Sequence, residues 1–285
     1  MIASEAEEKA AEIESIMNEE CCEKIKKSFN KDQNDIEIEP GVQLESWKVL
    51  SGLEYSLKAS KLIENEKAVF FEIKNFKKKK RKIDKLCHIY DDGNCLGYDY
   101  FVLNTLGPTL EELRIDAVEH KFSLGTTYLI RIQCVDALEQ LHSTGLMHNQ
   151  IVSKAFAIED GSPRRIVLYD LQNASEIVEH AAEPLNDEDL TKPFQSCVVS
   201  TPDDLESLLY LMILWIDGVL PWSNIQSKRL AMHTKLAVKT TEEIRHLLDT
   251  VPSADTIDYS GIKKVLFDGL RKRNLQNAPY DWELS

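Results

Sequence analysis

The sequence predicts an α+β protein in which short strands precede long helices. The stretch "WKVLSGLEYSLKASKLIENEKAVFFEIKN", residues 47–75, has short apolar or alternating runs between polar turns, a pattern typical of strands. A second strand pair is expected in "LCHIYDDGNCLGYDYFVLN", residues 86–104. From Thr109 onward helical periodicity dominates. Because strands come first and helices second, we expect a small β-rich part followed by a larger helical part.

Three helices are expected, and each has its own pattern. Residues 122–145, "FSLGTTYLIRIQCVDALEQLHSTG", predict a long helix, and residues 202–218, "PDDLESLLYLMILWIDG", are apolar nearly all round and predict a buried one. Residues 3–29 predict an extra N-terminal amphipathic helix, with an acidic face for solubility. The apolar stripe of this helix makes it a candidate docking element, and the alternative is a frayed acidic tail. Its large apolar residues, the partner-binding candidates, are Ile13, Met17, Ile25 and Phe29.

Composition restricts the possible partners. The chain has 285 residues, 43% of them hydrophobic, and a net charge of −14. Such an acidic chain is not expected to bind nucleic acid, so protein partners are the better expectation. No apolar run has the length of a membrane span, and the acidic start does not resemble a signal peptide, so an intracellular location is expected. The six cysteines have no zinc-site spacing and are expected to be reduced: Cys21, Cys22, Cys87, Cys95, Cys134 and Cys197.

Four ordered segments resemble one known family. "VLNTLGPTLEELR" at 102–114 resembles the hinge and following helix of the casein kinase 1 superfamily of protein kinases, and three later segments resemble its helices. "WKVL" at 47–50 and "YDWE" at 280–283 favour the tau-tubulin kinase-like branch. The resemblance covers about residues 40–285 and implies a two-lobed kinase-like fold. It divides the chain into an N-terminal helix and linker, residues 1–39, an N-lobe, residues 40–106, and a C-lobe, residues 107–285.

The stretch "GLMHNQIVSKAFAI", residues 145–158, then aligns with the kinase catalytic loop, whose pattern is H-R-D-x-K-P-x-N. The resemblance places Gln150 at the catalytic base, Val152 at the phosphate-contacting lysine and Ala155 at the metal-binding asparagine. A glutamine is no base at neutral pH, valine carries no charge and alanine has no oxygen for magnesium. The D-F-G motif appears as Asp170-Leu171-Gln172, so Asp170 alone keeps a metal-binding carboxylate.

The N-terminal part of the sequence also lacks residues that the kinase resemblance leads us to expect. The segment that should be glycine-rich contains one glycine, Gly52. Glu72 stands at the position of the phosphate-pairing lysine, although a shift of two residues would place Lys74 there. The basic run Lys77 to Lys82 is either a nuclear localisation signal or acidic-partner patch, or more simply a solvated face.

Other family positions carry architecture rather than chemistry. The resemblance places His148 and Leu171 in the hydrophobic spine that joins kinase lobes, and Asp204 at the buried acid that bonds to the catalytic-loop backbone. The segment between Asp170 and Asp204 lacks the family's substrate platform, so no site for a substrate hydroxyl is recognisable.

The sequence therefore predicts a catalytically inactive pseudokinase that acts as a protein-binding scaffold or allosteric regulator. No enzyme activity, no cofactor and no metal site are expected, because the glycine loop, the base and two phosphate or metal ligands are all replaced. Two alternatives stay open: a divergent kinase that uses Asp170 and Lys74, and a nucleotide-sensing module with an atypical ATP site.

Overall fold

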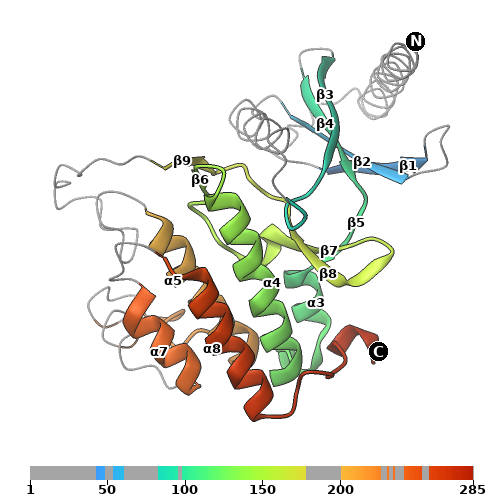
Figure 1. Ribbon diagram of the computed structural model, residues 1–285. Helices are drawn as coiled ribbons and strands as arrows, with labels where there is room; N and C mark the ends of the chain where they lie inside the picture. Colours follow the sequence, from blue (N-terminus) through green and yellow to red (C-terminus); the bar gives the residue numbers. More distant parts are fainter. Residues whose placement is uncertain are drawn as a thin grey trace, which may run out of the picture. The chain divides into compact units, whose positions relative to one another are not determined.

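The structure is a computed structural model that describes residues 43–48, 54–60, 83–95, 98–177, 200–225, 230, 234, 241–251 and 257–284. These residues fall into two compact units (Figure 1). The first contains the described residues up to Ser60 together with 87–106, and the second contains 83–86 and the described residues from Gly107 onward. Several sequence predictions lie outside the described residues: those for Gly52, Glu72, Lys74, Lys77 to Lys82, and residues 3–29 with Ile13, Met17, Ile25 and Phe29.

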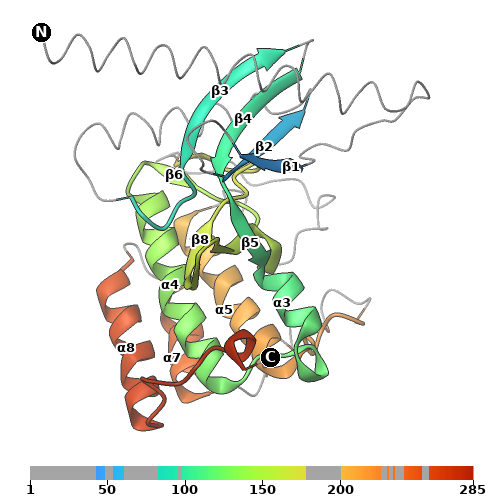
Figure 2. The same cartoon turned by 90° about the vertical axis from the view of Figure 1, so that its right-hand side faces the viewer.

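The first unit contains a four-stranded antiparallel sheet in the order β1-β2-β4-β3 (Figure 2). Its strands are β1 (Gln43–Lys48), β2 (Glu54–Ser60), β3 (Ile89–Cys95) and β4 (Tyr98–Asn104). The strand pair expected within residues 86–104 is therefore confirmed as β3 and β4.

Small and large residues fit together across the β3–β4 pair. Gly93 lies opposite Tyr100, and a Cβ added to this glycine would come within 2.4 Å of the tyrosine hydroxyl oxygen. Glycine is therefore required where the buried Tyr100 ring crosses the neighbouring strand. Val102 and Leu103 of β4 are also buried. Glycine and the apolar residues together explain why this hairpin has a packed face.

The second unit is mainly helical. Its longer helices are α3 (Leu110–Asp116), α4 (Leu124–His142), α5 (Thr201–Asp217), α7 (Glu242–Thr250) and α8 (Tyr259–Lys272), and its 3₁₀ turns are η1 (Val118–His120), η2 (Ser153–Ala155) and η4 (Asp281–Glu283). Helix α4 packs against α5 and α8, and α7 contacts both of those helices (Figure 1). The long helix expected within 122–145 and the buried helix expected within 202–218 are confirmed.

Helix α5 is buried because both of its faces carry large apolar residues. Leu208, Leu209, Met212 and Trp215 are at most 3% exposed, so the helix lies inside the unit rather than on its surface. Its N-terminus is capped by Ser200, which exchanges hydrogen bonds with Asp203. These features fix the axis of the helix that carries Asp204.

Short strands connect the helices of the second unit. β5 (Leu106–Thr109), β7 (Phe156–Glu159) and β8 (Ser162–Leu168) form a three-stranded sheet, and β6 (Leu146–Met147) pairs with β9 (Ser175–Glu176). The 3₁₀ turn η4 packs against the β7–β8 hairpin, because the Trp282 indole donates a 2.9 Å hydrogen bond to the carbonyl oxygen of Pro163. Arg164 and Glu283 add a two-pronged ion pair at 2.6 and 2.9 Å.

Within the described residues, no helix has the length and apolar content that crossing a lipid bilayer requires.

Candidate functional site

The candidate site is the loop that follows β6, residues 148–155, together with the segment that follows β8. Two strand pairings bring these segments together. Met147 of β6 lies opposite Ser175 of β9, and Phe156 of β7 lies opposite Leu168 of β8. The backbone N–H of Tyr169 also donates a 3.0 Å hydrogen bond to the carbonyl oxygen of Ala155. The two segments that the sequence aligned with the catalytic loop and the magnesium motif therefore lie side by side.

Asp204 on α5 holds the backbone of this loop. Its carboxylate accepts hydrogen bonds from the N–H groups of His148 at 2.6 Å and Asn149 at 2.9 Å. The Asp204 side chain is 2% exposed, so these bonds are shielded from water and are charge-assisted. The role that the resemblance gave to Asp204 corresponds to this geometry.

The same carboxylate has a third partner, which sequence reasoning missed. His142 Nε2 lies 2.9 Å from Asp204 Oδ2, and His142 Nδ1 contacts the hydroxyl of Tyr259 on α8. Burial, followed by the charge of Asp204, raises the pKa of Tyr259, so its hydroxyl stays protonated and can donate to the imidazole. A chain of hydrogen bonds therefore runs from α8 through His142 to the loop backbone. The only signal in the sequence was the histidine at the end of the predicted helix 122–145.

His148 is itself buried, at 2% exposure. Burial lowers the pKa of this histidine and outweighs the Asp204 carboxylate, which acts in the opposite direction. Its Nδ1 accepts a 3.3 Å hydrogen bond from the Gln150 N–H, which is the role of an unprotonated ring nitrogen. Leu171 is fully buried as well. Both residues lie in the apolar interior of this unit, and neither has the exposure of a reacting group.

The positions that carry chemistry in kinases hold neutral side chains here. Gln150 is exposed, and its side-chain oxygen accepts a hydrogen bond from the amide of Asn173. Val152 is half-buried, and Ala155 is fully buried in η2, at the end of the loop. No carboxylate occupies any of these three positions, so they supply neither a general base nor a carboxylate ligand for a metal ion.

Asn149 gives the loop its sharp turn. Its φ is +68°, in the left-handed region that asparagine tolerates better than most residues. The side-chain amide donates to the carbonyl oxygen of Asn173 at 2.7 Å and to the Ser175 hydroxyl at 2.9 Å. Gln150 and Asn149 thus tie the loop to the segment after β8 through neutral amides, an arrangement that the sequence did not reveal.

A second buried contact connects η2 to helix α5. The indole N–H of Trp215 on α5 donates a 2.9 Å hydrogen bond to the hydroxyl of Ser153. Trp215 is fully buried and Ser153 is 4% exposed. Together with Asp204, this bond attaches both ends of the loop to helix α5.

The kinase resemblance implies Mg²⁺ and a nucleotide, which oxygen-bearing side chains of these segments would have to bind. Asp170 is half-buried, and its Oδ1 accepts a 3.4 Å hydrogen bond from the N–H of Gln172. Ala155, at the position of the metal-binding asparagine, has no side-chain oxygen, and within the described part of the chain no group of three or more His, Cys, Asp or Glu side chains could hold a metal ion. The described residues therefore do not form the usual magnesium site of two oxygen-bearing side chains.

The comparisons with known proteins agree with the fold. No protein-family model matches the chain. A probable serine/threonine-protein kinase of Dictyostelium discoideum is 24% identical over 260 residues, which cover 83% of this chain and 52% of that protein. A probable casein kinase I homolog of Encephalitozoon cuniculi is 26% identical over 228 residues, covering 68% of this chain and 74% of the homolog. The chain thus spans about half the length of the Dictyostelium relative.

A solved structure gives the same result. The structure of vaccinia related kinase 3 matches with a TM-score of 0.65 and 19% identity, over 84% of this chain and 93% of that one. The chain therefore has a protein kinase fold, α+β and two-lobed as the sequence predicted. The similarity to a probable casein kinase I homolog supports the resemblance to the casein kinase 1 superfamily.

The comparisons contradict the expectation that this chain is not an enzyme. The relatives are named as a serine/threonine-protein kinase and a casein kinase I homolog, and these names point to an enzyme. The expectation gave too much weight to Gln150, Val152 and Ala155. Phosphoryl transfer depends mainly on positioning and electrostatic stabilisation by many groups, so the loss of a few side chains in one loop does not exclude it.

Proposed function

We propose that this chain is a divergent casein kinase 1-type protein, of the tau-tubulin kinase-like branch, that works as a protein-binding scaffold or allosteric regulator. One observation carries the proposal. The backbone of the loop is held at His148 and Asn149 by Asp204, while the side chain at the position of the base, Gln150, is a neutral amide bonded to Asn173. The backbone contacts of the loop are present, and its side-chain amides form hydrogen bonds that fix the loop conformation.

A fixed shape is what a regulator of this kind needs. A protein shifts the state of its partner only by binding the two states of that partner with different affinities. A loop attached to α5 at Asp204 and at Ser153 presents one conformation, so little ordering has to accompany binding. The net charge of −14 favours a protein over nucleic acid as the partner.

A second candidate function is phosphotransfer by a divergent site or nucleotide sensing. The names of the relatives favour it, and Asp170 keeps the one carboxylate of the magnesium motif. Such a site would differ in composition from the usual one, because the loop contributes Gln150 and Ala155 in place of an acid and an amide.

Two variants separate the candidates. The full chain is crosslinked to its stoichiometric partner, the complex is purified, and the amount of partner retained is measured. The same experiment is carried out with Asp170→Asn and with Gln150→Ala. A scaffold or regulator retains the partner in both variants, because neither change removes a bond that holds the loop to α5. If the full chain has no stoichiometric partner, or if Asp170→Asn loses it, the proposal is wrong. Transfer of radiolabelled phosphate from ATP that disappears with Asp170→Asn would establish the second candidate.

A further inference from the structure

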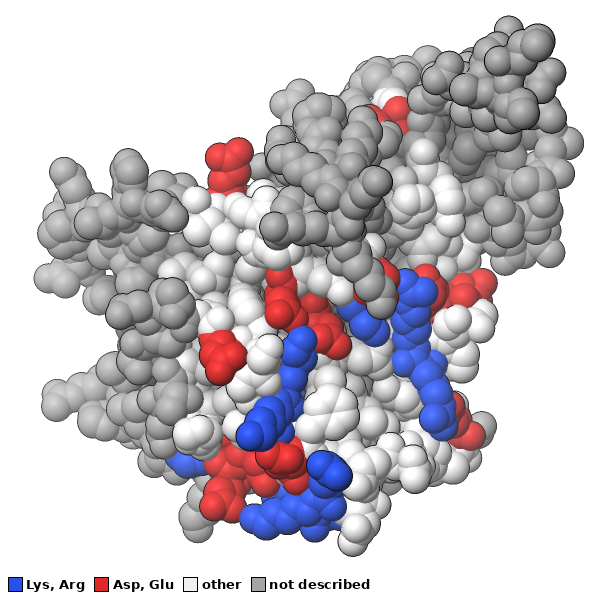
Figure 3. Space-filling model, viewed as in Figure 1, with Lys and Arg blue, Asp and Glu red and all other residues white. Residues whose placement is uncertain are grey.

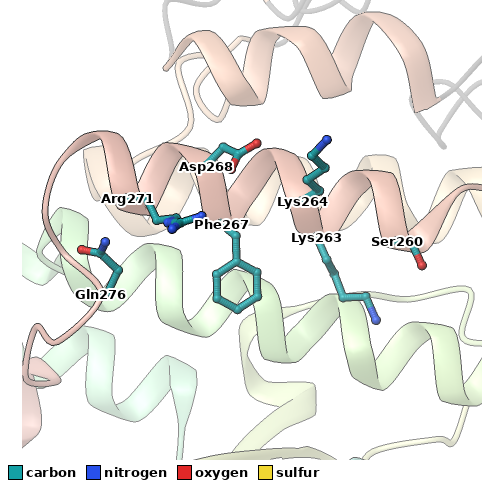
Figure 4. Close-up of a pocket in the computed structure, with 7 residues that line it drawn as sticks. All are labelled: Ser260, Lys263, Lys264, Phe267, Asp268, Arg271 and Gln276. Carbon is teal, nitrogen blue, oxygen red and sulfur yellow. The ribbon is translucent and has the colours of Figure 1, made fainter.

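Helix α8 has one buried face and one face that carries no part of the core. Ile262, Leu266 and Leu270 are at most 6% exposed and belong to the interior. The outward stripe consists of residues spaced by four, three and four positions, so they lie on one side of the helix: Ser260, Lys264, Phe267 and Arg271. With Lys263, Asp268 and Gln276 they line an open groove of about 630 Å³ (Figure 4).

The centre of this groove is aromatic. Phe267 is 49% exposed, although it lies in the middle of a long helix whose other large apolar residues are buried. A single exposed apolar side chain is ordinary on a protein surface. The groove is of interest because the aromatic ring is flanked by cations along the same stripe, and aromatic residues and arginine dominate the energetics of protein interfaces.

The basic residues in and around the groove differ in how they are neutralised. Lys263 contacts the carboxylates of Asp136 at 2.8 Å and Glu139 at 2.6 Å, so its charge is compensated by α4. Lys272, just outside the groove, pairs with Glu242 at 3.0 Å. In the part of the chain that the structure describes, neither Lys264 nor Arg271 has an ion pair.

The two cations without an ion pair have a defined separation, and the one acid in the groove lining, Asp268, lies between them in the sequence. They are seven residues apart on the helix, about 10 Å along its axis at 1.5 Å per residue, with Phe267 between them. Acidic and basic side chains lie beside one another in the lower part of the face that carries α8 (Figure 3), and two cations without an ion pair are a local feature of a chain whose net charge is −14.

We propose that the α8 groove docks an acidic segment of a partner protein. An apolar side chain of that segment packs on the Phe267 ring, and carboxylates on either side pair with Lys264 and Arg271. Carboxylates about 10 Å apart lie roughly three residues apart in an extended peptide, or seven apart on a helix. The inference rests on the proposed function and describes its partner by chemistry. An anionic membrane is the less suitable occupant, because the strongly acidic chain would be repelled from it.

The test is a selection of peptides on the immobilised full chain. A library of random 12-residue peptides is selected on the wild type and counter-selected on the Phe267→Ser/Arg271→Gln double variant. Enriched peptides should contain an apolar residue flanked by Asp or Glu. If no peptide is enriched, or if the enriched peptides are neutral or basic, the proposal is overturned.

Matched variants then test the surface itself by fluorescence anisotropy with an enriched peptide. Lys264→Gln and Arg271→Gln should each weaken binding about threefold to tenfold, and Phe267→Ser at least tenfold. Lys272→Gln is the control, because it removes the same charge one residue away and should change affinity less than twofold. An equal effect of Lys272→Gln, or binding of phosphatidylserine vesicles with the same sensitivity to these variants, contradicts the proposal.

Failure here can be told apart from failure of the proposed function. If the crosslinked partner of the full chain is retained when Phe267→Ser and Arg271→Gln are combined, this surface is wrong and the proposed function stands. The exposed position of all three side chains means that the variants are expected to fold. If Phe267→Ser lowers the melting temperature, the test uses Lys264→Gln and Arg271→Gln instead, because these variants keep the aromatic ring.

Discussion

Asp204 on helix α5 accepts a 2.6 Å hydrogen bond from the backbone N–H of His148, and this buried bond fixes the loop that kinases use for catalysis. The loop, α5 and α4 meet at one carboxylate, because His142 binds to it as well. The geometry of this loop therefore depends on the buried Asp204 as well as on the loop's own residues, such as Asn149 at φ +68°.

Asp204→Ala should destabilise the protein strongly. The substitution leaves the N–H groups of His148 and Asn149 and the Nε2 of His142 without their acceptor in the interior. An unpaired buried donor costs about 1–3 kcal/mol in free energy of unfolding, so the total loss should be at least that large. Urea denaturation followed by circular dichroism measures this loss of free energy of unfolding.

Two control variants should change the urea midpoint little: Asp268→Ala, which removes an exposed acid on α8, and Gln150→Ala. Equal shifts for Asp204→Ala and Gln150→Ala would show that the loop is not held from α5.

The contact between Trp215 and Ser153 makes a second stability prediction. Ser153→Ala removes the acceptor of the buried indole N–H and should cost about 1–3 kcal/mol. Ser143→Ala, at an exposed position at the end of α4, provides the matched control and should cost much less. Comparable urea midpoints for the two variants would mean that the indole finds another partner.

Glu243 on α7 should make the stability depend on pH in the acidic range. It accepts hydrogen bonds from Tyr128 at 2.8 Å and from Arg273 at 2.8 and 3.1 Å. Burial opposes ionisation of the carboxyl, but these bonds and one from its own backbone outweigh burial and lower its pKa from 4.5 to about 2. Because the pKa is lower in the folded state, the stabilisation is complete above the unfolded pKa and is lost as the pH falls toward about 2.

The measurement compares the wild type with Glu243→Gln. Between pH 4.5 and 2, the wild type should lose about 3 kcal/mol more of its free energy of unfolding than the variant does. Using the difference removes the contribution of the other carboxyl groups. Parallel curves for the two proteins over this range would refute the role of Glu243.

Gln150→Asp should increase whatever rate of phosphate transfer the wild type has. The side chain is exposed, so the change adds an acid at the position of the base without disturbing the packing. General base catalysis contributes typically 10²–10⁴-fold, and an increase of about 10² is expected. Transfer of radiolabelled phosphate is measured beside Gln150→Asn, which is neutral and should leave the rate unchanged. The same rate in all three proteins would exclude a role for a base at this position.

Some of this structure was readable from the sequence, and the reasons are physical. The helix at Thr201–Asp217 was predictable because a run that is apolar nearly all round can only be buried. The β3–β4 pair was expected within residues 86–104 as a second strand pair. Asp204 was found only through resemblance, since one acid among several in a helix gives no indication of the groups that bind it.

The remaining contacts depend on residues far apart in the chain. The hydroxyl of Tyr259 reaches His142 across 117 positions, and Trp215 reaches Ser153 across 62. Neither pair has a local pattern. The groove on α8 was missed for a related reason, because the sequence does not show which exposed basic residues form ion pairs. In the described residues Lys263 and Lys272 have acidic partners, whereas Lys264 and Arg271 have none. The expectation about catalysis was wrong because it inferred the absence of activity from replaced side chains, whereas the relatives are named as kinases.

The central claim, that this kinase-fold chain works by binding a protein, is tested most directly by the affinity for its purified partner. Isothermal titration of the full chain is carried out with the wild type and with the Gln150→Ala/Asp170→Asn double variant, each with and without Mg·ATP. The account predicts one dissociation constant, within twofold, in all four titrations. Binding that requires Mg·ATP, or that weakens tenfold or more in the double variant, would contradict it.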